Sequence, residues 1–260
     1  MNILITGSRS GIGLNTGIEL LKRGHYIYFT VHRNTQVKTL LDKLKELNIS
    51  TNYSVFKLDI TDEKDRNQLY DLDIDVLINN ASIGVGGSIL DLDIKKIREN
   101  FEVNLFSNIE MIKTYHSSLN VNNKKGRVLV LSSLAGIISL PFMGSYCSTK
   151  ASLISLVTSL KRELSLIDAN LDIALIEPGI YVTGFNEAMI DNKCDSSLFN
   201  NIYPKVTYYQ KKLFKIFGRK DLASITKKIV KAVECKKLRL KYRAPFIQVL
   251  GTKLYMMIFK

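Results

Sequence analysis

Short apolar runs alternate with longer stretches of helical periodicity along the whole chain. Runs rich in β-branched and aromatic residues predict strands at positions 3–6, 26–31, 53–58, 76–78, 128–131 and 171–176. Apolar residues at helical spacing lie between them, at 11–23, 37–47, 93–119 and 145–166. Such alternation is typical of βαβ units, whose strands form a parallel sheet. We therefore predict an α/β fold, a three-layer doubly wound parallel sheet in one domain over residues 1–260.

Length and composition agree with a globular domain of this kind. The chain has 260 residues, of which 46% are apolar, and this is enough to bury one core. The cysteines at 147, 194 and 235 have no metal-ligand spacing and are interpreted as reduced thiols. No apolar run approaches the ~18 residues of a membrane span, and the first residues are typical of a strand rather than of a secretory signal. We expect a cytoplasmic protein.

The positive charge is concentrated at the C-terminal end. Residues 205–260 hold 16 lysines and arginines against Asp221 and Glu234, whereas residues 1–204 are nearly neutral. The tail, residues 236–260, ends in a stretch that is apolar around most of a helix, so a groove of its own subunit, a partner subunit or an anionic bilayer has to cover it. A solvated basic surface is another interpretation. No nucleic-acid-binding motif accompanies the charge, and we expect no nucleic-acid partner.

A glycine-rich turn follows the first predicted strand. The run TGSRSGIG at 6–13 leads into the next predicted helix. Glycines permit a tight turn and close approach of the backbone to a pyrophosphate, which the helix N-terminus attracts. A purely structural turn is the alternative. The position of the turn favours a dinucleotide site that includes Gly7, Arg9, Ser10, Gly11, Ile12 and Gly13.

A tyrosine and a lysine lie four residues apart in the predicted helix 145–166. Tyr146 and Lys150 therefore emerge on one face, one turn apart. An adjacent ammonium favours phenolate and lowers the pKa of a tyrosine, which can then act as general acid or base. Ser133, after the strand 128–131, is placed to donate a hydrogen bond to the same substrate oxygen. A chance pairing on a helix is the competing interpretation.

Several motifs together are similar to one family. The chain contains T-G-x-x-x-G-I-G, then Asn79-Asn80-Ala81, Asn104, Ser133 and finally Tyr146-x-x-x-Lys150, in that order over residues 1 to about 183. In this it resembles the short-chain dehydrogenases/reductases with a single Rossmann-fold domain. The resemblance implies NAD(P)-dependent oxidation of an alcohol or reduction of a carbonyl. The family's usual glycine after Asn-Asn-Ala is Ser82 here.

The resemblance also implies roles for individual residues. Tyr146 would be the acid/base, Lys150 would hold the nicotinamide ribose and tune Tyr146, and Ser133 would polarise the substrate oxygen. Asn104 would hold a water in a proton relay. Asp59 corresponds to an adenine-contacting aspartate, although it or its neighbours Thr61 and Asp62 are also suited to cap a helix. Further implied cofactor contacts are Ile60, Asn80, Ala81, Pro178, Gly179, Ile180 and Thr183.

The end of the second strand indicates the cofactor. An acidic residue there would bind the ribose 2′-hydroxyl of NAD and repel a 2′-phosphate. The strand instead runs into His32 and Arg33, with Arg9 as a further cation, and these can pair with the phosphate through charge-assisted hydrogen bonds. NADP is therefore favoured over NAD. The competing interpretation is that Arg33 is a solvated loop cation.

The substrate side of the site is predicted to be apolar. Residues 184–217 correspond to the family's variable substrate lid and are rich in aromatic residues. With Leu134, Leu140 and Phe142 they can wall an apolar pocket, which fits a lipophilic or aromatic carbonyl or alcohol. The long helices suggest a homodimer or homotetramer. The alternative function is a non-catalytic NADP-binding regulator or a membrane-associated interaction protein.

Overall fold

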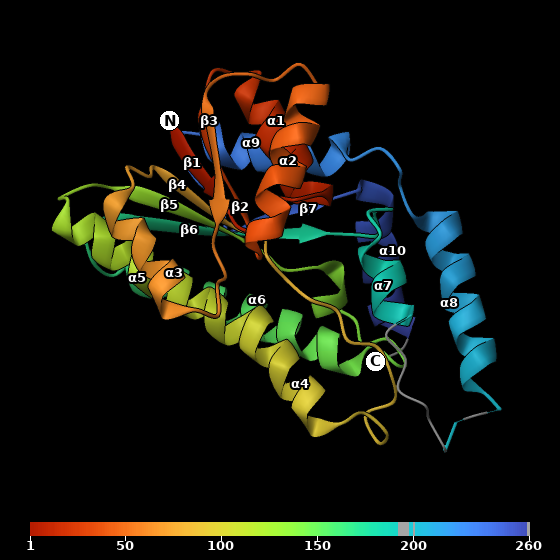
Figure 1. Cartoon of the computed structure of the whole chain (residues 1–260). Coiled ribbons are helices and arrows are strands. Elements are labelled where there is room, and N and C mark those ends of the chain that lie inside the picture. The colour runs from red at the N-terminus through yellow and green to blue at the C-terminus, as the bar shows by residue number, and fades with distance from the viewer. Residues whose placement is uncertain (192–197, 200, 259–260) are drawn as a thin grey trace.

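The computed structural model describes residues 1–191, 198–199 and 201–258. Seven parallel strands form one sheet in the order β3-β2-β1-β4-β5-β6-β7, with helices on both faces (Figure 1). The strands are β1 (Asn2–Ile5), β2 (Tyr26–Val31), β3 (Tyr53–Lys57), β4 (Val76–Asn79), β5 (Gly126–Leu131), β6 (Leu171–Pro178) and β7 (Lys241–Ala244). The predicted doubly wound α/β fold is confirmed.

Two hydrophobic layers cover the two faces of the sheet. Helices α1 (Gly11–Leu21), α2 (Asn34–Glu46) and α9 (Ala223–Glu234) pack on one face. The other face is covered by α3 (Glu63–Asn67), η1 (Gln68–Asp71), α4 (Ile94–Phe101), η2 (Glu102–Phe106), α5 (Ser107–Val121) and α6 (Gly144–Leu164). Neighbouring residues of a strand serve opposite layers, as the strand period requires: Ile3 and Ile5 enter the first layer and Leu4 the second.

The remaining elements surround the carboxyl ends of the strands. They are η3 (Leu134–Gly136), α7 (Phe185–Asp191), α8 (Tyr203–Phe217) and α10 (Phe246–Ile258). The chain reverses its direction of travel along the sheet at β1, which lies beside both β2 and β4. Doubly wound sheets bind ligands at this switch point, beyond the carboxyl ends of the strands. The predicted glycine turn, Asn80 and Ser133 all follow strands at this edge.

Two parts of the fold differ from the sequence-based prediction. The single helix expected over 93–119 is interrupted by the π-helical turn η2, which contains Asn104. The expected tail 236–260 contributes a strand, since β7 pairs with β6 and buries Leu238, Tyr242 and Ala244 in the core. An ion pair between Arg243 and the buried Glu177 ties β7 to β6. The tail's last two residues, 259–260, lie outside the described residues.

Arg127 of β5 caps the C-terminal end of α9. Its guanidinium donates to the carbonyls of Ala232 (2.7 Å), Val233 (2.6 Å) and Cys235 (3.0 Å). Carbonyls in the last turn of a helix lack intrahelical partners and carry the negative end of the helix dipole. One half-buried cation therefore holds α9 onto the sheet.

We expect Arg127→Met to lower the free energy of unfolding by about 3 kcal/mol, because it removes charge-assisted bonds and leaves carbonyls unpaired. Denaturant unfolding measures this loss. Lys45→Met, at an exposed position on α2, is the control and should change stability by less than about 0.5 kcal/mol. Equal stability of Arg127→Met and the parent chain would contradict the capping role.

Candidate active site

The glycine turn between β1 and α1 has the conformation that its residues predict. Gly7 and Gly11 have φ values of +62° and +61°, in the region that favours glycine. A Cβ on Gly7 would lie 2.8 Å from Cα of Ala81, and one on Gly13 would lie 2.6 Å from Nδ2 of Asn80. The backbone thus closes on the end of β4 at positions where a side chain would not fit.

The same turn fits the diphosphate of a dinucleotide. Helix α1 begins at Gly11, and its N-cap residue, Ser10, makes no side-chain capping bond, so backbone N–H groups of the first turn are left for an anion. Ser8 anchors the turn from below, since its hydroxyl donates to the carbonyl of Thr30 (3.1 Å) and accepts from the Thr30 N–H (2.9 Å). Arg9 and Ser10 are exposed, whereas Ile12 is half-buried and packs against the core.

Asn80 joins the turn to β4. Its side-chain amide donates to the carbonyls of Thr6 (2.8 Å) and Gly7 (3.0 Å). The hydroxyl of Thr6 in turn accepts from the backbone N–H groups of Asn80 and Ala81. The predicted cofactor residues Asn80 and Ala81 therefore shape the turn through contacts within the protein.

Asn104 connects the loop after β4 to helix α6. Its Oδ1 accepts from the hydroxyl of Ser82 (3.0 Å) and the N–H of Ile83 (2.8 Å), and its Nδ2 donates to the hydroxyl of Thr149 (3.2 Å). Ser82 replaces the family's glycine and supplies one of these bonds. Asn104 lies in the π-helical turn η2, a kind of turn common at functional sites, and its carbonyl accepts from the side chain of Asn108 in α5 (3.1 Å). The water-holding role remains a prediction.

Three of the predicted catalytic side chains converge at the end of β5. The hydroxyl of Ser133 is close enough to the Tyr146 phenol to lower its pKa, and it donates to the carbonyl of Pro178 (3.4 Å). The Nζ atom of Lys150 lies 5.6 Å from the centre of the Tyr146 ring and donates to the carbonyl of Leu131 (3.1 Å). Tyr146 and Lys150 are almost fully buried. Residues far apart in the sequence thus form one cluster of a phenol, a hydroxyl and an amine.

The expected lowering of the Tyr146 pKa is wrong for this arrangement. Burial raises the pKa of the Tyr146 phenol, and the nearby Ser133 hydroxyl opposes the rise only in part. Burial also lowers the pKa of Lys150 to about 7. The lysine is bonded to Leu131 rather than to the phenol, and near neutral pH it is only partly charged. Desolvation of both groups therefore outweighs their mutual attraction.

The predicted adenosine contacts lie at the ends of β2 and β3. His32 Nε2 lies 3.0 Å from Oδ2 of Asp59, and the hydroxyl of Thr61 donates to the same carboxylate (2.8 Å). These contacts lower the pKa of Asp59 against the opposing effect of burial, which is the largest single influence. The helix cap predicted as an alternative is made by Asp62, which accepts from the Lys64 N–H of α3. Ile60 is buried nearby.

Arg33 stands at the position where the cofactors differ. It is the exposed N-cap residue of α2, and its backbone N–H donates to Gln36 (3.2 Å). No salt bridge to Arg33 is found among the described residues. Arg33 is therefore an exposed residue that follows His32 directly after β2, and its contact with a 2′-phosphate remains a prediction.

The loop after β6 approaches the glycine turn. A Cβ on Gly11 would lie 3.3 Å from Cβ of Thr183. Pro178 is the last residue of β6 and Gly179 follows it. The structure thus brings Thr183 to the turn, while cofactor contacts of Pro178, Gly179 and Ile180 remain predictions.

Gln248 of α10 is a site-forming residue that sequence reasoning missed. Its Oε1 accepts from the N–H of Ile180 (2.6 Å), and its Nε2 donates to the carbonyl of Phe217 (2.7 Å). Gly179 leaves the space that Gln248 Oε1 occupies, because a Cβ there would collide with it. Ile180 is 68 residues and Phe217 is 31 residues from Gln248, and a lone glutamine in an apolar segment gives no sequence signal of these contacts.

Helix α7 covers the catalytic cluster. The ring of Phe185 lies 5.6 Å from that of Tyr146, and Met189 is 1% exposed. Met189 packs closely on Gly84, where a Cβ would lie 2.8 Å from Cβ of Met189. Met143, Cys147 and Phe214 complete this apolar cover. Part of the predicted lid, 192–197 and 200, lies outside the described residues.

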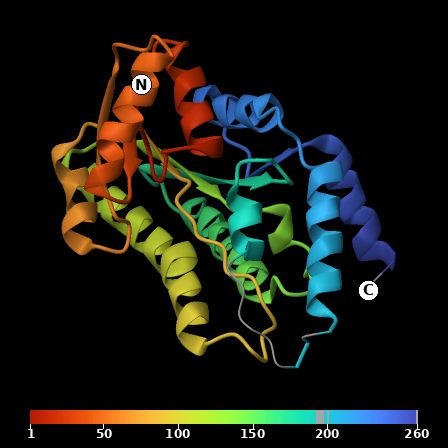
Figure 2. The same cartoon turned by 45° about the vertical axis from the view of Figure 1, so that its right-hand side comes forward.

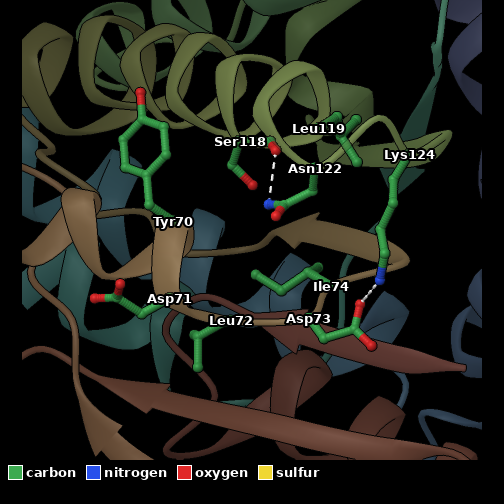
Figure 3. A pocket seen from close by; sticks show the side chains of 9 residues that line it. All are labelled: Tyr70, Asp71, Leu72, Asp73, Ile74, Ser118, Leu119, Asn122 and Lys124. Atoms are coloured by element: carbon green, nitrogen blue, oxygen red, sulfur yellow. Dashed lines mark hydrogen bonds and ion pairs between the residues drawn. The ribbon is translucent and has the colours of Figure 1, made fainter.

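A separate cavity of about 220 Å³ lies at the opposite edge of the sheet (Figure 3). It is lined by residues of 70–74 and of the end of α5, including Ser118, Asn122 and Lys124. Lys124 forms an ion pair with Asp73, and the amide of Asn122 donates to the carbonyl of Ser118 (2.9 Å). The cavity therefore lies away from the catalytic cluster, and these polar groups are already paired.

Comparisons with known proteins agree with this architecture. A family model of short chain dehydrogenases matches residues 1–193. The uncharacterized oxidoreductase YusZ of Bacillus subtilis (strain 168) is 30% identical over 220 residues, which cover 80% of this chain and 76% of that protein. An NADP-dependent 3-hydroxy acid dehydrogenase of Schizosaccharomyces pombe is 31% identical over 210 residues, which cover 77% of this chain and 78% of that protein. A short chain dehydrogenase/reductase of Burkholderia phymatum, solved in complex with NAD, has a TM-score of 0.81 at 18% identity, covering 98% of this chain and 92% of that one.

Proposed function

This chain belongs to the short-chain dehydrogenase/reductase family, and we propose that it reduces lipophilic carbonyl compounds with NADPH. The observation that carries the proposal is the buried cluster of Tyr146, Ser133 and Lys150 beside a glycine turn shaped for a diphosphate. Enzymes of this family are oxidoreductases that use NAD or NADP. The substrate class, the direction and the preference for NADP are the steps that we propose.

The chain's own residues hold the reactants and move the proton. When bound, the reduced nicotinamide supplies the hydride. The first turn of α1 would hold the diphosphate, and the loop containing Thr183 would cover the nicotinamide end. Ser133 would donate a hydrogen bond to the substrate oxygen, and Tyr146 would give that oxygen its proton. Asn104 positions Tyr146 through Thr149, whose hydroxyl donates to the Tyr146 carbonyl (2.8 Å).

The protonation of the cluster supports reduction. Burial keeps the Tyr146 phenol neutral at physiological pH, and a neutral phenol is a proton donor. Lys150, with its pKa lowered to about 7, can exist in both protonation states near neutrality. After Tyr146 has given up its proton, Lys150 would stabilise the phenolate and return a proton to it.

The cover of the cluster supports a lipophilic substrate. The ring of Phe185 lies 5.6 Å from that of Tyr146, and Met143, Cys147 and Met189 are buried in the same apolar cluster. An apolar pocket binds apolar groups by removing them from water and offers no counter-ion to a charged acid. The test is the decrease of NADPH absorbance with a panel of hydrophobic aldehydes and ketones, beside carboxylate-bearing ketones of equal size. Turnover of the carboxylates alone would overturn the substrate class.

Arg33 is expected to set the preference for NADP. We expect Arg33→Asp to raise the KM for NADPH by roughly 10- to 100-fold, because a charge-assisted bond to the 2′-phosphate is lost and repulsion replaces it. The KM for NADH should stay equal or fall. Steady-state kinetics with both nucleotides measure the change.

The matched control for Arg33→Asp is Lys38→Asp. Lys38 is an exposed cation one turn further along α2, so this variant makes the same change of net charge without altering the cap. It should leave the ratio of the two KM values unchanged. An equal change of the KM ratio in both variants would mean that Arg33 acts only through its contribution to the net surface charge.

We also propose that the chain forms a homodimer or homotetramer through α5 and α6. The outward face of α6 exposes small residues, Ser148, Ala151 and Ser155, which permit close approach of a second helix. Phe106, at the start of α5, is 49% exposed. Light scattering of the purified protein measures the oligomer directly.

A further inference from the structure

Helix α10 presents a continuous apolar face to solvent. Phe246, Ile247, Leu250, Leu254 and Met257 are between 57% and 79% exposed. Their spacing places all five within a sector of roughly 100° of the helix. Of the alternatives predicted for this segment, a groove of its own subunit does not cover these residues.

The exposed face belongs to a helix that is firmly attached. On the opposite side of α10, Gln248 bonds to Ile180 and Phe217. Thr252 is buried and its hydroxyl donates to the Gln248 carbonyl (2.9 Å). The polar side of α10 thus faces the protein and the apolar side faces outward, which is the reverse of an ordinary surface helix.

Exposed basic side chains lie on α10 and on or just after α8. Helix α8 lies beside α10 (Figure 2), and the two are joined through the bond from Gln248 to Phe217. Neither helix contains an aspartate or glutamate. The exposed cations nearby are Lys205, Lys211, Lys212, Lys215, Arg219, Lys220 and Lys253. We call the exposed residues of α8 and α10 the α8–α10 surface.

We propose that the α8–α10 surface docks on an anionic phospholipid bilayer. An apolar stripe bordered by lysines is suited to the interface, where the apolar groups enter the acyl boundary and the lysines meet lipid phosphates. Among the described residues, no helix is long and apolar enough to cross a membrane. A 13-residue helix therefore lies in the plane of the interface.

The charge favours a bilayer over a second copy of the chain. A symmetric dimer through this face would bring the same lysines of two chains together, and like charges facing each other are unfavourable. An anionic lipid surface neutralises them. Docking would also bring the lid helix α8 to the lipid, a route for a lipophilic substrate; this last step alone rests on the proposed function.

Vesicle sedimentation of the full chain tests the proposal without any need for turnover. The protein is mixed with phosphatidylcholine vesicles that contain or lack phosphatidylglycerol. We expect it to pellet with the anionic vesicles and to stay in solution with the neutral ones. Lys205→Glu/Lys212→Glu/Lys215→Glu should weaken binding on the order of a hundredfold, since each lysine contributes about fivefold.

A second triple variant tests the apolar face. Leu250→Ser/Leu254→Ser/Met257→Ser should lower vesicle affinity on the order of a hundredfold, with unchanged thermal unfolding because the side chains are exposed. Controls of equal chemistry are Leu90→Ser/Leu166→Ser/Ile167→Ser, which lie elsewhere and are also exposed, and Lys43→Glu/Lys45→Glu/Lys95→Glu. Both should bind like the parent chain.

Three results would overturn the proposal. The first is a full chain that stays in solution with anionic vesicles. The second is undiminished binding by the serine variant. The third is a change of oligomeric state: the parent chain is a dimer by light scattering, the serine variant is a monomer, and neither of the two binds vesicles. This result would assign the face to a second copy of the chain. If the full chain binds anionic vesicles but does not reduce carbonyl compounds, the result counts against the proposed function only.

Discussion

Tyr146→Phe is expected to lower kcat for carbonyl reduction by about 10³-fold while the protein still folds and binds NADPH. The substitution removes only the phenol oxygen, the atom that would transfer the proton, and general acid catalysis is worth about 10²- to 10⁴-fold. The ring stays, so its contact with Phe185 (5.6 Å) and the cover by α7 are kept. Single-turnover kinetics and NADPH fluorescence separate chemistry from binding.

Tyr115→Phe is the matched control for the loss of a buried phenol. Its hydroxyl donates from α5 to the carbonyl of Ile74 (3.1 Å), which precedes β4, so it lies at the amino ends of the strands and away from the catalytic cluster. This variant should lose about 1 kcal/mol of stability and keep its kcat. Retained kcat in Tyr146→Phe would reject the mechanism, and equal loss in both variants would assign the effect to packing.

The parts of the site that sequence reasoning could predict are local motifs. The glycine turn needs positive φ at Gly7 and Gly11, and only the residue type at those positions reveals it. Tyr146 and Lys150 share a helix face because their spacing is one turn. The fold and the family are confirmed, since both depend on periodicity and on the order of such motifs along the chain.

The parts that sequence reasoning missed depend on contacts between distant segments. The bonds from Gln248 to the loop after β6 join residues 68 apart. Strand β7 is too short to show a period and is held by pairing with β6 and by the ion pair of Arg243 with Glu177. The spacing of apolar residues around Asn104 gives no sign that the helix contains a π-helical turn there.

The electrostatic error has a related cause. Spacing alone shows that Lys150 is near Tyr146, but it does not show how deeply both are buried. Desolvation acts on each group separately, and it raises the pKa of Tyr146 and lowers that of Lys150. The direction of the tyrosine shift could only follow from a structure in which burial is known.

Lys150→Met is expected to stabilise the protein while nearly abolishing its activity. In the folded chain burial lowers the pKa of Lys150 to about 7, against an ordinary value of 10.5. At pH 6 the buried lysine is charged in both states, and its burial costs on the order of 4 kcal/mol. Methionine removes that cost but leaves the Leu131 carbonyl without its donor, at about 1 kcal/mol. A gain of roughly 3 kcal/mol should remain at pH 6.

The pH dependence gives the sharper test. Between pH 7 and 9 the unfolded chain binds the Lys150 proton and the folded chain releases it, so the stability of the parent chain should rise by about 2 kcal/mol. The raised pKa of Cys147 opposes part of this rise as the pH approaches the ordinary thiol value of 9.0, and the raised pKa of Tyr146 does so at still higher pH, since the folded chain then holds more protons. Lys150→Met should lack the rise, and Lys96→Met, at an exposed site, should keep it. Denaturant unfolding at pH 6, 7 and 9, without added nucleotide, measures each value. A parallel rise in Lys150→Met would mean that another group titrates, and a variant less stable than the parent at pH 6 would mean that the bond to Leu131 outweighs the buried charge.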